Sequence, residues 1–380
     1  MQVPPLDLKT QYQAIKQEMD SALSEVINSQ HFVLGPTVDK LEAELAGYLK
    51  TRYAIAIASG SDALLITLMA LKVKAGDEVI TSPFTFFATG GAIARLGARP
   101  VFTDIDPVTY NISPQGIRSY LAKSAKKVKA IMPVHLYGQA CDMAEILAIG
   151  NEYNIPVIED AAQSLGSEYN GHKTGTLGLM GCYSFYPTKN LGAWGDAGLI
   201  TTEDETLAKL IKVLRVHGAE NRYYHQHIGI NSRLDAMQAA VLSVKLKHLD
   251  QWNAERLKRA NLYTKLLKDA ELLKYLSTPI VKENRNHIYH QYTIRITDGR
   301  RDKLRDFLKA NNIGAEIYYP LPLHLQECFA YLGYKKGDLP ESEKAALEAL
   351  SLPMYPELTD QMQEYVVEKM KEFFSQKSSR

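Results

Sequence analysis

The sequence predicts an α/β protein with a mainly parallel central sheet, helices on both faces of that sheet, and a smaller C-terminal α+β domain. Three observations predict this class. Short β-branched runs alternate with helical patterns from residue 53 to about residue 202. Most of the first five runs lie ten to twenty residues apart, which is the spacing of right-handed βαβ crossovers. After residue 203, long helical patterns replace this alternation.

The elements of the large part of the chain follow in order. Helical periodicity predicts helices over 11–29 and 37–50, separated by a turn at 32–36. The strands of the sheet are expected at 53–59, 77–82, 98–106, 128–135, 155–160, 181–187 and 197–202. The helical pattern over 233–268 is longer than a typical helix, so we expect it to bend or to link two bodies.

The chain is expected to divide into a large domain, residues 1–253, and a small domain, residues 254–380. Within the small domain the pattern predicts alternating strands and helices. The strands are expected at 290–297 and 314–319, and the helices at 301–312, 341–349 and 360–375.

Composition narrows the range of partners. The net charge is +1, so no overall field favours nucleic acid or an anionic membrane, and we expect small molecules or copies of the chain as partners. Cys141, Cys182 and Cys328 are too few and too scattered for a disulfide framework, and no C-x-x-C or H-E-x-x-H suggests a metal site. The N-terminus lacks an export signal pattern, and no 18-residue apolar run occurs, so the protein is expected to be cytoplasmic.

One lysine is set in an unusual frame. The strand-like run before Pro187 is followed by Lys189 and then by three glycines, in "SFYPTKNLGAWGDAGLI". So many glycines in a short loop are entropically costly unless another group must approach closely.

A carboxylate follows a neighbouring strand. The apolar run "IPVIEDAAQS" ends at Asp160, with Gln163 three residues further on. Alone, this pattern is more often a helix cap than a catalytic group. Together with Lys189, however, it matches what pyridoxal phosphate requires: an amine that binds the aldehyde as an imine, and a carboxylate that keeps the ring nitrogen protonated. Gln163 could bond the phenolic oxygen of the ring.

Donors for a phosphate follow the first strand. In "ASGSDALL", Gly60 and Ser61 precede a helix whose first amides are free, and helix N-termini bind anions. Ser184 could add a hydroxyl to the same site, although it is also an ordinary strand serine. A cover for the open face of the ring could come from the three phenylalanines of "SPFTFFATG", at least two of which core packing also explains.

These stretches, with "VFTDIDPVTYNI", "PVHLYGQACDM" and "IGINSRLDAMQAAVL", resemble the sugar aminotransferases of the DegT/DnrJ/StrS family. The resemblance extends from "PPLDLKTQY" to "SLPMYPEL". It implies the fold of the fold-type I pyridoxal phosphate enzymes, which is that of aspartate aminotransferase, and it implies pyridoxal 5'-phosphate as the cofactor.

The resemblance also implies roles for individual residues. Lys189 becomes the lysine that binds the cofactor covalently, Asp160 the partner of the pyridine nitrogen and Gln163 the partner of the phenolic oxygen. The remaining implied cofactor contacts are the phosphate-binding residues Gly60, Ser61 and Ser184, the ring-stacking Phe86, and Asn231, which reaches the phosphate of the other subunit. A homodimer with shared active sites follows.

The implied reaction is transfer of an amino group from glutamate to a keto carbon of a nucleotide-linked keto sugar. Members of the family that carry histidine in place of the lysine are dehydratases, whereas this sequence keeps Lys189, so transamination is favoured. The loop "TKNLGAWGDAG" is more similar to members that aminate C3 than to those that aminate C4, and amino-sugar or surface-polysaccharide biosynthesis is the expected setting. Four residues are weaker candidates for substrate contact: Arg233, His135, Tyr137 and Tyr318, the last of which stands where several relatives have histidine.

Three alternatives stay open. A 4-keto nucleotide-sugar aminotransferase is the nearest one. A nicotinamide oxidoreductase would require G-x-G-x-x-G after the first strand, and the sequence has none. A non-catalytic, pyridoxal phosphate-binding regulator comes from a different class, but the aminotransferase pattern leaves no segment for a DNA-binding module.

Overall fold

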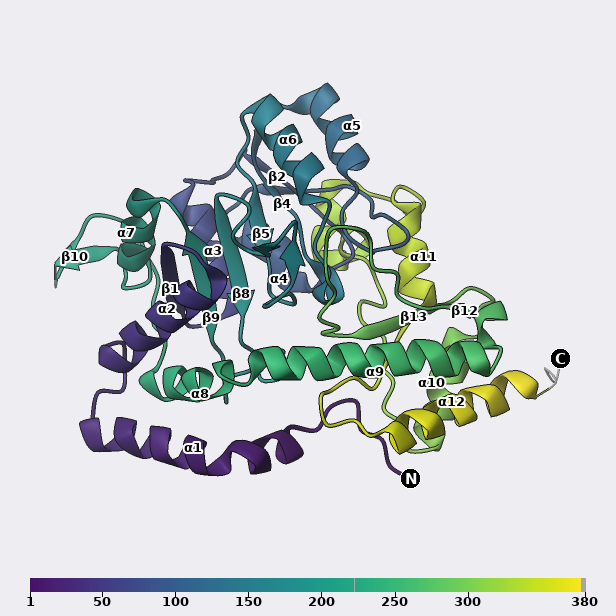
Figure 1. Cartoon of the computed structure of the whole chain (residues 1–380). Helices are drawn as coiled ribbons and strands as arrows, with labels where there is room; N and C mark the ends of the chain where they lie inside the picture. The colour runs from purple at the N-terminus through teal and green to yellow at the C-terminus, as the bar shows by residue number, and fades with distance from the viewer. Residues whose placement is uncertain (222, 377–380) are drawn as a thin grey trace.

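The computed structural model describes residues 1–221 and 223–376 (Figure 1). Its central sheet has the order β1-β9-β8-β5 followed by β4-β2-β3, and parallel bridges Ile131–Val157 and Val134–Asp160 join the two parts. Only β9 in this sheet runs antiparallel to its neighbours, so the prediction of a mainly parallel sheet is confirmed. The strands are β1 (Tyr53–Ile57), β2 (Glu78–Thr81), β3 (Arg99–Phe102), β4 (Val128–Met132), β5 (Ile158–Asp160), β8 (Met180–Ser184) and β9 (Gly198–Thr202).

Helices cover both faces of the sheet because successive strand residues point to opposite sides. Ile55 packs with α3, α4 and α7 on one face, whereas Ala56 packs with α2 and α8 (Ala236–Leu246) on the other, where α5 and α6 also cover the β2–β4 half. The helices up to this point are α1 (Leu8–Ser29), α2 (Pro36–Leu49), α3 (Gly60–Ala70), α4 (Phe87–Arg95), α5 (Pro114–Ser124), α6 (Met143–Tyr153) and α7 (Glu205–Leu214). Short elements complete this part: η1 (Leu136–Gly138) and the ribbons β6 (Glu168–Tyr169) with β7 (His172–Lys173) and β10 (Ala219–Asn221) with β11 (Tyr224–His225).

The long helical pattern is interrupted, as expected. It forms α8 (Ala236–Leu246) and α9 (Leu249–Asp269), with a break at Lys247 and His248. Helix α9 runs from the central sheet to the C-terminal part of the chain (Figure 1). The expected domain boundary at 253/254 falls inside α9 and stays a prediction.

The C-terminal part is built on an antiparallel sheet of order β12-β13-β14, packed against α9, α10 and α12. The N-terminal Val3 joins this core and bridges to Ile313. The elements are η2 (Leu272–Lys274), β12 (Leu276–Ser277), β13 (Tyr292–Ile296), α10 (Arg301–Ala310), η3 (Leu323–Leu325), η4 (Glu327–Leu332), α11 (Pro340–Glu348), β14 (Ala349–Leu352) and α12 (Asp360–Ser375).

The predicted strand at 314–319 was wrong. This segment pairs with β14 at one bridge only, Glu316–Ser351. Tyr319 has a left-handed backbone with φ of 65°, which ends the extended course of this segment along the cavity described below. The sequence pattern therefore identified an extended segment correctly, but this segment does not form the continuous row of backbone hydrogen bonds that defines a strand of a sheet.

A buried ion pair ties α2 to β1 and to the end of α7. Glu42 Oε1 accepts hydrogen bonds from Arg215 Nη1 at 2.5 Å and from the backbone N–H of Ala56 at 3.0 Å. Arg215 Nη1 also donates to the carbonyl of Ala56 at 2.9 Å, and both charged side chains are less than a tenth exposed. Removing one partner would leave the other charge buried and unpaired.

We therefore expect Glu42→Gln to lower the free energy of unfolding by about 3 kcal/mol. Urea denaturation at a fixed protein concentration measures this change. Glu205→Gln, which removes an exposed partner of Lys209 in α7, is the control and should leave the midpoint unchanged. Equal midpoints for wild type and Glu42→Gln would contradict a stabilising role of the buried pair.

Candidate functional site

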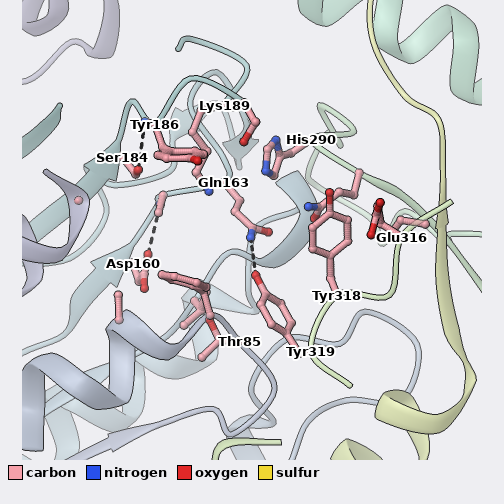
Figure 2. Close-up of a pocket in the computed structure, with 18 of the residues that line it drawn as sticks. Thr85, Asp160, Gln163, Ser184, Tyr186, Lys189, His290, Glu316, Tyr318 and Tyr319 are labelled. Carbon is pink, nitrogen blue, oxygen red and sulfur yellow. Dashed lines mark hydrogen bonds between the residues drawn. The ribbon is translucent and has the colours of Figure 1, made fainter. Parts of the chain in front are cut away.

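A cavity of about 860 Å³ lies where the strands of the central sheet end and the C-terminal part begins. Figure 2 shows Lys189, Asp160 and Gln163 meeting His290, Tyr318 and Tyr319 in this space. This is the position where open α/β sheets bind ligands. The sequence-predicted residues that line it are Gly60, Ser61, Phe86, Asp160, Gln163, Ser184, Lys189 and Tyr318.

Lys189 enters the cavity from the loop after β8. Its backbone N–H donates to the carbonyl of Tyr186 at 2.8 Å, which closes a turn. The loop is tight because a Cβ on Gly192 would lie 2.3 Å from the carbonyl oxygen of Pro187. Burial lowers the pKa of Lys189 to about 8, although the charge of Asp160 acts in the opposite direction. The neutral, nucleophilic form of the amine is therefore far more populated near neutral pH than in an exposed lysine.

Asp160 ends β5, next to β8 in the sheet. Its Oδ2 accepts a hydrogen bond from Thr89 Oγ1 at 2.8 Å, and its Oδ1 accepts one from the N–H of Ala162 at 3.2 Å. Burial raises the pKa of Asp160, whereas these two hydrogen bonds and the charge of Lys189 lower it. The carboxylate is therefore held in place with capacity to accept a further donor, such as a protonated ring nitrogen.

The N-terminus of α3 meets the end of β8 at very close range. A Cβ on Gly60 would lie 2.5 Å from Cβ of Ser184, so only glycine fits at this position. Ser59 caps the helix by accepting from the N–H of Asp62 at 3.1 Å, and the first-turn amides have no intrahelical acceptor. Gly60, Ser61 and Ser184 thus form a cradle of donors suited to a phosphate.

Gln163 and Phe86 line the space between these groups. Gln163 Oε1 accepts from the N–H of Tyr137 at 2.7 Å, and its Nε2 donates to the hydroxyl of Tyr319 at 2.9 Å. One amide hydrogen of Gln163 is left for another acceptor. Phe86 precedes α4 and is 60% exposed, so its ring is available to cover a planar group.

His135 and Tyr137 do not line the cavity of the described chain. The His135 ring accepts from the N–H of Cys141 at Nδ1, so its Nε2 carries the proton and donates to Glu159 at 2.8 Å. Both ring nitrogens are therefore used within the protein. Tyr137 is buried behind Gln163, and its contribution to the site comes through its backbone N–H.

Asn231 and Arg233 also lie outside the cavity of their own chain, as far as the described residues go. Asn231 is exposed, and its Oδ1 accepts from Nε of Arg233 at 3.0 Å. Ser232, between them, donates to Asp62 Oδ2 at 2.7 Å, which places this segment beside the start of α3. A direct cofactor contact by Asn231 stays a prediction that involves a second subunit.

The structure adds residues that sequence reasoning missed. Thr89 orients Asp160, and His290 lies beside Lys189 (Figure 2). Nδ2 of Asn190 donates to Asn253 Oδ1 and to the carbonyl of Ile288, so Asn190 Oδ1 accepts from Nδ1 of His290 at 3.1 Å. The pKa of His290 lies well below its usual value because of burial and the nearby charge of Lys189, so the ring is neutral. No local pattern distinguishes "HIYHQY" as a site segment.

Two kinds of feature are absent from residues 1–221 and 223–376. No cluster of three or more histidine, cysteine, aspartate or glutamate side chains could hold a metal ion. No helix in these ranges combines the length and apolar character needed to cross a bilayer.

The profile of the DegT/DnrJ/EryC1/StrS aminotransferase family matches residues 13–371. The chain belongs to this family. This aminotransferase is 54% identical over 374 residues to a "Pleiotropic regulatory protein" of Geobacillus stearothermophilus, covering 98% of this chain and 99% of that one. It is 43% identical to the UDP-2-acetamido-2-deoxy-3-oxo-D-glucuronate aminotransferase of Pseudomonas aeruginosa, covering 93% and 95%. The solved structure of DesV from S. venezuelae in complex with a ketimine intermediate superposes with a TM-score of 0.93 at 36% identity, covering 99% and 100%.

Pyridoxal phosphate is the cofactor of this aminotransferase, and its fold is that of the fold-type I enzymes. The residues in the cavity fit the cofactor. In the described chain, the amine of Lys189 has Asp160 as its electrostatic partner and forms no hydrogen bond that would hinder attack on an aldehyde. The close approach of Gly60 and Ser184 supplies the phosphate cradle at the other end.

We expect the reactivity of Lys189 in the cofactor-free protein to rise with pH around a midpoint near 8, because burial lowers its pKa to about that value. Asp160→Asn should lower the midpoint further, because the negative charge of Asp160 raises the pKa of Lys189. Reductive methylation with formaldehyde at a series of pH values, quantified per peptide by mass spectrometry, measures both.

Exposed Lys209, whose hydrogen bond to Glu205 raises its pKa, is the internal control and should react with a higher midpoint. A common midpoint for Lys189 and Lys209 would contradict the effect of the cavity on the amine.

Proposed function

We propose that the protein transfers the amino group of glutamate to C3 of a nucleotide-linked keto sugar. The observation that carries this proposal is the pairing of Lys189 and Asp160 in a cavity that also holds a phosphate cradle and space for a large ligand. The proposed substrate class is supported by similarity to four proteins, at 37–43% identity, whose names specify 3-oxo, 3-dehydro or 3-amino nucleotide sugars.

The residues divide the chemistry between them. Pyridoxal phosphate, when bound, supplies a ring that withdraws electrons from the carbon attached to the amino group. Asp160 would hold the positive charge on the ring nitrogen, and Gln163 would donate to the phenolic oxygen. Lys189 Nζ would bind the aldehyde and, when free, would accept and release the proton that moves in the reaction, and its lowered pKa suits both roles.

A 4-keto sugar is the alternative substrate for the same machinery. A different class is suggested by the regulatory name of the Geobacillus relative, which at 54% identity is more similar than the named sugar aminotransferases. A regulator would bind the cofactor through the same amine and carboxylate. Catalysis is supported over a binding role alone because perturbed pKa values of this kind cluster at sites where protons are moved.

The setting of the reaction is also part of the proposal. A homodimer with shared sites is supported by the exposed position of Asn231 beside α3 and by the exposure of Phe86 and Tyr186 at the rim of the cavity.

A cytoplasmic location is supported by the three free cysteines. Amino-sugar or surface-polysaccharide biosynthesis would use such a product, and a domain boundary at 253/254 would let α9 link the two domains.

The substrate is tested with a panel of 3-oxo and 4-oxo sugars linked to UDP, dTDP or GDP, with glutamate as the donor. We expect a 3-oxo sugar to be aminated at least about tenfold faster, in kcat/KM, than its 4-oxo counterpart. Mass spectrometry and NMR of the product identify the aminated carbon. Lys189→Ala is the control for background reaction, and preference for a 4-oxo sugar would overturn the C3 assignment.

Shared sites are tested by mixing Lys189→Ala with Asn231→Ala. If each site combines Lys189 of one chain with Asn231 of the other, a mixed dimer has one doubly damaged site and one intact site. Random reassociation makes about half of the dimers mixed, so roughly a quarter of all sites become intact. Activity should rise towards that fraction of wild type after co-refolding. Verified mixed dimers no more active than the mean of the two parents would remove Asn231 from the partner's site.

A further inference from the structure

One buried arginine lines the cavity. Arg256 belongs to α9 and is 3% exposed. Its Nη1 donates to three backbone carbonyls: those of Tyr289 at 3.1 Å, His290 at 3.4 Å and Met354 at 3.0 Å. These bonds fix the guanidinium against two segments of the C-terminal part.

The charge of Arg256 has no contacting counter-ion. Three arginines of the described chain are buried, and the other two form ion pairs, Arg215 with Glu42 and Arg301 with Asp302. Arg256 forms no ion pair with any described residue, and its Nε has no hydrogen-bond partner. Glu357 acts on it only at longer range, and burial lowers the pKa of the guanidinium to about 10.

A buried, unpaired cation is unfavourable unless an anion completes the site. Nη1 makes all the hydrogen bonds that the guanidinium forms within the described chain, so Nη2 is left for the cavity. The planar donors of a guanidinium match the two oxygens of a carboxylate. Arg256 is also linked to the reacting centre, because it holds the backbone of His290, whose ring lies beside Lys189 (Figure 2).

We propose that Arg256 binds a carboxylate of the amino donor and so places the donor's amino group beside Lys189. The assignment rests on the proposed function, in which a carboxylate-bearing donor enters this cavity in every cycle. A uronic acid carboxylate on the sugar has the same chemistry, and the two sources are separated by the half-reactions below.

The test compares two half-reactions of the holoenzyme by stopped-flow absorbance. The half-saturating glutamate concentration should rise about tenfold or more in two variants. Arg256→Lys keeps the charge but loses the planar pair of N–H donors, and Arg256→Gln loses the charge as well. The half-reaction of the aminated enzyme with the keto sugar should stay within about twofold of wild type. Arg259→Met is the matched control: Arg259 lies one turn further along α9, pairs with Glu255 and Asp360, and does not line the cavity.

Three results would overturn the proposal: unchanged glutamate dependence in both variants, equal loss in both half-reactions, or loss confined to the sugar half-reaction. The last result would assign Arg256 to a carboxylate of the sugar. An equal loss in Arg259→Met would indicate that the effect comes from the helix and not from the guanidinium.

Binding gives a second readout that does not depend on turnover or on the variants folding. Isothermal titration of the wild-type holoenzyme with glutarate, a dicarboxylate without an amine, should show saturable binding, whereas neutral glutaramide should bind at least about tenfold more weakly. Equal affinity for glutarate and glutaramide would exclude a carboxylate site. If the wild type transfers no amino group from glutamate to any keto sugar, the proposed function fails. If it does and Arg256→Lys keeps its glutamate dependence, only the present inference fails.

Discussion

The shared burial of Lys189 and Asp160 is the constraint on which the rest of the site depends. Taken separately, burial lowers the pKa of the amine and raises that of the carboxyl group, so each group tends towards its neutral form. Their mutual attraction opposes both shifts. The balance leaves an amine that is partly neutral and therefore nucleophilic, beside a carboxylate that Thr89 and the N–H of Ala162 hold in position.

The sheet brings this pair together and sets its distance from the phosphate cradle. Strands β5 and β8 are parallel neighbours, so their carboxyl ends deliver Asp160 and the Lys189 loop to one edge. Glycines then allow the remaining approaches: Gly60 lets α3 meet Ser184, and Gly192 lets the loop fold back on Pro187. A side chain at Gly60 would displace Ser184, and one at Gly192 would open the turn that carries Lys189.

The sequence predicted those parts of the site that lie within a few residues of a strand end. The seven strands, Lys189, Asp160, Gln163 and the Gly60 turn were all found in this way, because periodicity and spacing determine which residues end neighbouring strands. Among residues supplied from distant segments, Tyr318 was found through the family resemblance, whereas His290 and Arg256 were not, because they reach the cavity only through tertiary packing of the C-terminal part. The strand predicted at 314–319 was wrong for the same reason. A local pattern indicates that a segment is extended, but it does not indicate whether a partner strand lies beside it.

The energetics of the cavity also bear on whether the protein catalyses or only senses a ligand. The cavity holds the partly neutralised Lys189, the buried carboxyl of Asp160 and the unpaired guanidinium of Arg256, and each of these is unfavourable for folding in the absence of a ligand. Binding of pyridoxal phosphate alone would use Lys189 for the imine and Asp160 for the ring nitrogen, but it leaves the guanidinium of Arg256 without a role. Their combination is explained when charge must be handled at three points of one reaction: at the ring nitrogen, at the moving proton and at the carboxylate of the donor. The arrangement of charges therefore favours turnover even though the relative with 54% identity carries a regulatory name.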